Sequence, residues 1–89
     1  MKAIVTVIGP DRIGIIAEIC TLLAQKGVNI VDIQQTVMQE FFTMNMLVDT
    51  TAMPGSFEDL QNALKSKGEE MNLSIRIQRE DIFTAMHQL

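Results

Sequence analysis

The 89-residue chain is poor in several residue types, and each shortage argues against a class of structure. It has one cysteine, so a disulfide bond within the chain is impossible and a reducing compartment is its natural setting. It has no tryptophan or tyrosine, and its first apolar run contains no aromatic residue. A sheet that stacks RNA bases needs aromatic side chains on its central strands, so the pattern argues against an RNA-binding sheet.

Positive charge and long apolar runs are also scarce. Seven basic residues stand against eleven acidic ones, and the net charge of −4 opposes approach to phosphate backbones and to anionic membrane surfaces. No basic start is followed by a long apolar stretch, so we expect neither a signal peptide nor a membrane span. We therefore expect a cytoplasmic protein whose partners include no nucleic acid and no membrane.

The residues that most often carry catalysis are few and isolated. His87 is the only histidine and is interpreted as a surface residue, while Cys20 lies on the apolar side of a predicted helix and is interpreted as a packing residue. No group of His, Cys and Asp has metal-ligand spacing, and the Gly-Lys-Ser/Thr phosphate-loop pattern is absent. We predict no catalytic residue, no metal site and no cofactor, and hence not an enzyme.

The chain does contain enough apolar material to fold. Hydrophobic residues make up 47% of it, which argues against disorder. Its length predicts one domain over residues 1–89. Seven methionines indicate an adaptable core or an interface that can repack.

Alternating and β-branched runs predict four strands. The first run is apolar on both faces, as is typical of a central strand covered on both sides. In the second the alternation slips around Gln34 and Gln35, which predicts a bulge there. Gln39 and Glu40 are the predicted turn to the third strand. The predicted strands span residues 1–8, 28–39, 41–50 and 72–79.

Helical spacing of apolar residues predicts two main helices and a short tail helix. The first spans 13–26, and its apolar stripe consists of Ile16, Ile19, Cys20 and Leu23. The second begins after the N-cap residue Ser56, and Gly68 is its predicted C′ residue. The tail helix covers about 81–89 and is too short to be stable without docking on another surface.

The resulting order is βαββαβ, which predicts an α+β, ferredoxin-like sandwich. In this arrangement a four-stranded antiparallel sheet carries two helices on one face. The other face keeps the apolar residues Ile4, Ile8 and Leu47, and an exposed apolar face usually has a partner. The tail helix and a second subunit are both candidates. The pattern leaves open whether two copies would join by sheet edges or by sheet faces.

The segment from Gly9 to Ile15 joins the first strand to the first helix. Its glycines permit backbone conformations and close approaches that a side chain would block. Asp11 is a good N-cap residue, and Arg12 adds a fork of donors. A loop of this kind presents N–H groups and the positive end of a helix dipole to a carboxylate or phosphate, although a tight capped turn alone would explain it equally well. Asn29 opens the second strand, and we expect its amide close to this loop.

These segments resemble the ACT domain, and the resemblance is strongest to the small, stand-alone ACT proteins of prokaryotes. The resemblance is carried by residues 4–15 with their Asp-Arg-x-Gly element, by Ala17-Glu18-Ile19, and by Gly27-Val28-Asn29-Ile30 with Asp32-Ile33. It implies a regulatory module that binds small ligands, mostly amino acids, often at a subunit interface.

The resemblance also implies a ligand between the first loop and the start of the second strand. The ligand-binding positions that it assigns are Gly9, Asp11, Arg12, Ile13, Gly14, Asn29 and Ile30. Some serine-binding members carry His at the position of Gly9 and Asn at that of Asp11, so serine specificity does not carry over. Asp11 would instead meet a ligand ammonium group, while backbone N–H groups near Ile13 and Gly14 meet its carboxylate.

Three functions follow as hypotheses. The first is a regulatory module that binds an amino acid and acts as a homodimer. The alternative is an interaction module without a ligand, which pairs with itself or regulates a partner enzyme. The third is a small enzyme, such as an acyl-phosphate hydrolase with Arg12 as a phosphate clamp, but no base or nucleophile is paired with a partner in the sequence.

Overall fold

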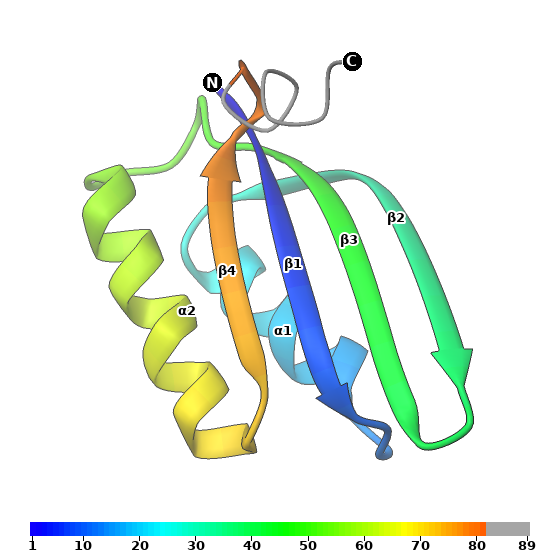
Figure 1. Ribbon diagram of the computed structural model, residues 1–89. Coiled ribbons are helices and arrows are strands. Elements are labelled where there is room, and N and C mark those ends of the chain that lie inside the picture. Colours follow the sequence, from blue (N-terminus) through cyan, green and yellow to red (C-terminus); the bar gives the residue numbers. More distant parts are fainter. Residues whose placement is uncertain (82–89) are drawn as a thin grey trace.

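The computed structural model describes residues 1–81 and has the predicted ferredoxin-like architecture (Figure 1). Its antiparallel sheet has the strand order β2-β3-β1-β4. The elements are β1 (Lys2–Pro10), α1 (Ile15–Gln25), β2 (Asn29–Met38), β3 (Phe41–Asp49), α2 (Phe57–Met71) and β4 (Ser74–Arg79). Residues 82–89, which include His87 and all but the first residue of the tail helix predicted over about 81–89, fall outside the described residues. No helix in the described part is long and apolar enough to cross a membrane.

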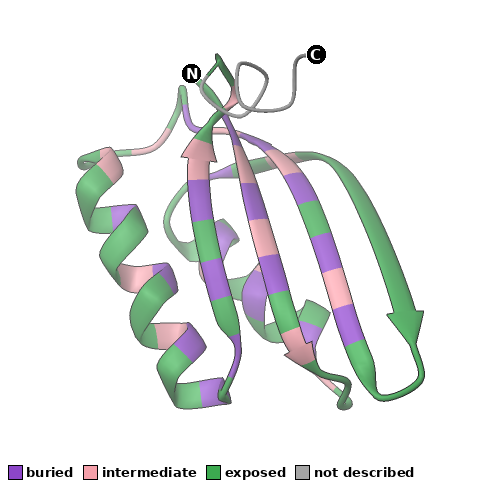
Figure 2. Cartoon of the chain, in the orientation of Figure 1, coloured by how far each residue is buried: buried purple, intermediate pink, exposed green. Residues whose placement is uncertain are grey.

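The core lies between the helices and one face of the sheet. Side chains alternate along a strand, so every second residue of β1 and β3 faces the helices. Figure 2 shows this alternation in β1, β3 and β4, whereas β2 is exposed along nearly its whole length. The buried residues of β1, β3 and α1 are Ala3, Val5, Val7, Phe42, Met44, Met46, Val48, Ile15, Ile19 and Leu23.

The apolar face of α1 differs from the predicted stripe by one position. The helix buries Ile15, Ile19 and Leu23, which follow one another at four-residue intervals. Ile16 was predicted to be buried, yet 36% of its surface remains exposed. Cys20 is partly buried against the core, in agreement with its predicted packing role. In Figure 1, α1 lies behind β1, and β2 lies well to the side of it.

The two helices begin differently. Ser56 caps α2 as predicted, because its hydroxyl accepts a hydrogen bond of 3.0 Å from the Asp59 N–H. Asp11 was predicted to cap α1, and this prediction is wrong. The N-cap residue is Gly14, in the left-handed region at φ 93°, and no side chain of the described residues caps this helix. The chain turns at a glycine, three residues after Asp11, before its backbone becomes helical.

The predicted end of α2 is also wrong. The helix continues through Gly68 to Met71, and Asn72 ends it with a left-handed backbone at φ 59°. Gly68 is buried because the chain folds back over it into β4, and the Leu73 N–H donates a 2.8 Å hydrogen bond to the Gly68 carbonyl. This glycine therefore serves a close approach between α2 and β4 and does not terminate the helix.

β2 contains its bulge at a different place from the predicted one. The register with β3 shifts between Ile30 and Asp32, which leaves Val31 as the additional residue. Gln34 and Gln35 pair regularly with β3, so the predicted bulge there is wrong. A strand that is exposed on both faces need not alternate strictly between apolar and polar residues. A break in its alternation therefore does not mark a shift in its pairing with the neighbouring strand. The predicted turn at Gln39 and Glu40 is confirmed by the neighbouring pair of Met38 and Phe41.

Candidate functional site

The loop after β1 and the start of β2 lie at opposite ends of the sheet. Both strands pair antiparallel to β3, so they run in the same direction. Asn29 and Lys2 both stand level with Asp49, whereas Pro10 and Met38 both stand level with Phe41. At about 3.3 Å per residue, roughly 25 Å separate Asn29 from the loop. The expectation that Asn29 and Ile30 lie beside the loop is therefore wrong within one chain.

The loop itself is held between the β2–β3 turn and the start of α1. The Asp11 N–H donates a 2.8 Å hydrogen bond to the Glu40 carbonyl. In the first hydrogen bond of the helix, the Glu18 N–H donates to the Gly14 carbonyl oxygen at 3.0 Å. Because no described side chain caps α1, the N–H groups of its first turn are available to an external acceptor.

A hollow of about 320 Å³ lies between the start of α1 and the last third of β2; we call it the loop hollow. Three of the predicted site residues, Asp11, Arg12 and Gly14, line it. Gly9 and Ile13 are not part of its wall. A Cβ atom on Gly9 would collide with the Leu73 side chain, so this glycine makes room for core packing. Ile13 is 99% exposed at the tip of the loop.

The sheet contributes residues to the loop hollow that the sequence did not indicate. These are Gln35 and Val37 of β2 and Phe42 of β3. Val37 pairs directly with Phe42, so both side chains stand on the helix face of the sheet. These three residues line the hollow because α1 leaves the end of β2 uncovered. No short sequence motif indicates where a helix will lie on the sheet. The alternation of β3 was the one available signal, since Phe42, Met44, Met46 and Val48 are apolar at every second position.

Ion pairs join the loop to α1, and α1 to α2. Arg12 Nη2 lies 3.3 Å from Glu18 Oε2, and Lys67 Nζ lies 3.7 Å from Glu18 Oε1 and 3.7 Å from Glu70 Oε1. Pairs this exposed contribute little to stability, but they do engage the guanidinium group of Arg12. The Asp11 carboxylate, in contrast, has no hydrogen bond or ion pair with the described residues. It is the unpaired charge on the wall of the loop hollow.

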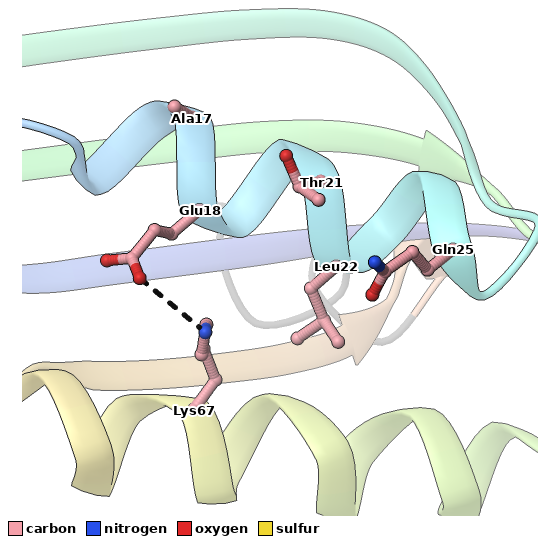
Figure 3. Close-up of a pocket in the computed structure, with 6 residues that line it drawn as sticks. All are labelled: Ala17, Glu18, Thr21, Leu22, Gln25 and Lys67. Carbon is pink, nitrogen blue, oxygen red and sulfur yellow. Dashed lines mark ion pairs between the residues drawn. The ribbon is translucent and has the colours of Figure 1, made fainter.

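A second hollow of about 290 Å³ lies between the two helices (Figure 3). α1 contributes Ala17, Glu18, Thr21, Leu22 and Gln25, and α2 contributes Lys67. The figure shows Glu18 and Lys67 reaching toward each other across it. Its two charged groups are thus already paired with one another. We regard the loop hollow, with its unpaired carboxylate and free N–H groups, as the candidate site.

Metal and thiol chemistry find little support in the described part of the chain. Residues 1–81 contain no group of three or more His, Cys, Asp or Glu residues that could hold a metal ion. Partial burial raises the pKa of the Cys20 thiol. A raised pKa keeps the thiol protonated near neutral pH, and the protonated form is a poor nucleophile.

Comparison with known proteins gives a consistent result. The ACT domain family model matches residues 2–78. A UPF0237 protein of Listeria innocua is 46% identical over the full length of both chains. The structure of an ACT domain protein from Streptococcus pneumoniae is 42% identical and superposes with a TM-score of 0.82, covering 93% of each chain. A putative glycine cleavage system transcriptional repressor is 28% identical with a TM-score of 0.72, over 86% of this chain and 44% of that one.

Proposed function

Since this chain belongs to the ACT domain family, whose members are regulatory modules that bind small ligands, we propose that it binds an amino acid and acts as a homodimer. In this proposal the module is a single domain over 1–89, has no catalytic activity of its own, and works in the cytoplasm without nucleic acid or membrane. The observation that carries the proposal is the loop hollow, where an unpaired carboxylate stands beside an uncapped helix start.

The two charged ends of an amino acid fit these two features. The Asp11 carboxylate accepts hydrogen bonds from the ligand ammonium group, and such charge-assisted bonds are the stronger ones in proteins. The N–H groups in the first turn of α1 donate to the ligand carboxylate, which the helix dipole also favours. Gly14 supports this arrangement because it has no side chain to cover the helix start.

The exposed edge of the sheet supports the homodimer. β2 is an edge strand, and nearly all of its residues are exposed, including Val31, Ile33 and Val37. Monomeric proteins usually protect a long edge strand with lysine, proline or a covering segment. β2 has no lysine or proline, and its single charge is Asp32. Such an edge favours pairing with another strand, and β2 of a second copy of the chain presents the same unpaired edge.

The bulge makes a symmetric pairing of two β2 strands possible. Ten residues less the additional Val31 leave nine positions in register, with Gln34 in the middle. A two-fold axis at Gln34 places residues of the same sheet face opposite each other, as antiparallel pairing requires. The opposed pairs are Ile33 with Gln35, Asp32 with Thr36, Ile30 with Val37, and Asn29 with Met38. No carboxylate meets another carboxylate in this arrangement.

This pairing would also bring part of the predicted site together. Asn29 and Ile30 are far from the loop of their own chain, but the pairing brings them beside Met38 and Val37 of the partner subunit. Ile30 and Val37 stand on the helix face with the loop hollow, whereas Asn29 and Met38 stand on the open face, away from it. Val37 lines the loop hollow, so Ile30 of the partner subunit would stand at its rim. The proposed site is therefore composite, with the loop from one copy and the start of β2 from the other. A dimer would contain two such sites.

The direct test is thermal melting followed by circular dichroism, with each standard amino acid added in turn. A ligand at a hundred times its Kd adds about 2.7 kcal/mol, which raises Tm by several degrees in a domain of this size. We expect a clear shift with at least one amino acid, and its loss in Asp11→Ala. Asn62→Ala, an exposed change on α2, is the control and should retain the shift. If no amino acid shifts Tm, the ligand-binding proposal fails.

A second candidate function is supported by exposed apolar residues at the loop end of the molecule. Ile13 at the loop tip and Met38 and Phe41 beside the turn are all exposed. An apolar surface of this kind suits a protein partner, such as a regulated enzyme, without any small ligand. This function would be favoured over the first by two results together. No amino acid would shift Tm, and the chain would bind an enzyme that Met38→Ser no longer binds.

A further inference from the structure

The loop hollow has an apolar wall formed by three different elements. Ile16 comes from α1, Val37 from β2 and Phe42 from β3. Phe42 is buried, while Ile16 is 36% and Val37 is 52% exposed. Water in contact with such side chains is readily displaced by an apolar group, and binding sites for small molecules are typically lined in this way.

The polar groups of the loop hollow are few, and they are already assigned. Asp11 is the partner of the ligand ammonium group in the proposed function. Arg12 is engaged by Glu18 at 3.3 Å, and Gln35 is neutral. A charged ligand side chain would therefore lie against Ile16 and Val37 without a free counter-charge, and burial of an unpaired charge is strongly unfavourable. An aliphatic or aromatic side chain meets no such obstacle.

The size of the loop hollow limits the ligand further. A volume of about 320 Å³ is at the lower end of the range for ligand pockets, roughly 300–1,000 Å³. It suits one amino acid and is small for a nucleotide. In the proposed dimer, Ile30 of the partner subunit would add a further apolar side chain next to Val37.

From this wall we infer that the ligand is an amino acid with a large apolar side chain, of the leucine, isoleucine, valine, methionine or phenylalanine class. The inference rests on the proposed function, because it specifies the ligand of the same site. The apolar side chain lies against Ile16, Val37 and Phe42, and the charged groups of the ligand face Asp11 and the start of α1.

Calorimetric titration of the full chain tests the inference. Alanine, serine, aspartate and lysine are compared with the five large apolar amino acids. A hydrophobic pocket distinguishes substrates by about tenfold or more per methylene group. We expect at least one large apolar amino acid to bind at least tenfold more tightly than alanine. If serine, aspartate or lysine binds best, the inference is overturned and the proposed function stands. If none of the nine binds and the remaining standard amino acids do not either, both fail.

Two variants test the wall directly. Val37→Ser and Ile16→Ser should weaken binding of the preferred apolar amino acid by about tenfold and change alanine binding much less. Ile8→Ser is the matched control, since Ile8 is 45% exposed on β1 but faces the other side of the sheet. Ile16 lies on α1, so its variant remains informative if Val37→Ser disturbs the β2 edge. Unchanged affinity in both wall variants, or an equal loss in Ile8→Ser, overturns the inference.

Discussion

At the residue scale, Asp49 at the end of β3 makes stability dependent on pH. Its Oδ1 accepts hydrogen bonds from the Thr51 hydroxyl at 2.6 Å and from the Thr51 N–H at 2.9 Å. These bonds lower the pKa of Asp49, with a smaller contribution from the N-terminal ammonium group 3.7 Å away. A carboxyl group whose pKa is lowered in the folded state stabilises that state above its unfolded pKa, and the contribution is lost as pH falls through the folded pKa.

We therefore predict that Tm of the parent chain falls more between pH 6 and pH 2 than that of Asp49→Asn. The difference should develop below about pH 4, where an unperturbed Asp begins to bind protons. Melting curves followed by circular dichroism measure it. Glu69→Gln, an exposed change at the end of α2, is the control and should follow the parent chain. Parallel curves for Asp49→Asn and the parent chain would contradict the prediction.

Single residues were predictable where the responsible contact is local. Ser56 caps α2 through a group three residues away, and the sequence contains both partners. Gly9 was assigned to ligand binding, yet its space is taken by Leu73, which is distant in sequence. Asn29 was assigned to the same site, although its strand runs in the direction that carries it to the other end. Contacts that depend on strand direction, or on packing between residues far apart in sequence, cannot be predicted from a short motif.

At the scale of elements, the junction of α2 and β4 depends on Gly68. Alanine is about 1 kcal/mol better than glycine in an ordinary helix interior. Here a Cβ atom would lie 2.7 Å from the Leu73 carbonyl oxygen and 3.3 Å from Ile75 Cγ1. We predict that Gly68→Ala lowers the free energy of unfolding, by about 1–3 kcal/mol, as overpacking does. Urea denaturation measures the change.

A neighbouring position provides the control for this prediction. Ser66 is exposed on α2, and Ser66→Ala should raise stability by a few tenths of a kcal/mol through helix propensity alone. A gain in both variants would mean that the junction relaxes to accept the Cβ atom of residue 68, contrary to the prediction.

The regular elements were mostly predictable because burial enforces their periodicity. β1 and β3 each bury one face in the core, and their apolar, β-branched and alternating residues identified both strands. β2 is exposed on both faces, so nothing in its residue pattern marked the bulge at Val31. The stripe of α1 was displaced for a related reason, since Ile16 faces a hollow that the helix and the sheet leave between them.

At the scale of the whole molecule, two surfaces are candidates for the interface of the proposed homodimer. One is the β2 edge, and the other is the open sheet face with Ile4, Ile8 and Leu47. The open face is polar along its middle, where the Thr6 hydroxyl donates a 2.9 Å hydrogen bond to Asn45 Oδ1. The edge offers unpaired backbone groups as well as apolar side chains, and we therefore favour it.

We predict that Ile33→Lys converts the proposed dimer into a monomer, whereas Ile8→Lys does not. Two lysines near the two-fold axis at Gln34 would repel each other, and lysine on an edge strand opposes pairing. Sedimentation velocity reports the oligomeric state, and circular dichroism verifies that both variants fold. The reverse result would indicate dimers joined by their open faces. A monomeric parent chain at about 50 μM, where an interface of standard affinity is largely formed, would contradict the homodimer itself.

Because β1 and β2 run in the same direction, the loop after β1 and the start of β2 lie at opposite ends of one chain. If the two halves of the site are about 25 Å apart in each chain and meet only across the symmetry axis, ligand binding and subunit association are thermodynamically linked. The apparent affinity for the ligand then rises with the amount of protein, and the ligand in turn strengthens the dimer. The cell would then set the threshold of the response through how much of this chain it makes, and an assay at high dilution would report a weaker apparent ligand affinity than one at high protein concentration.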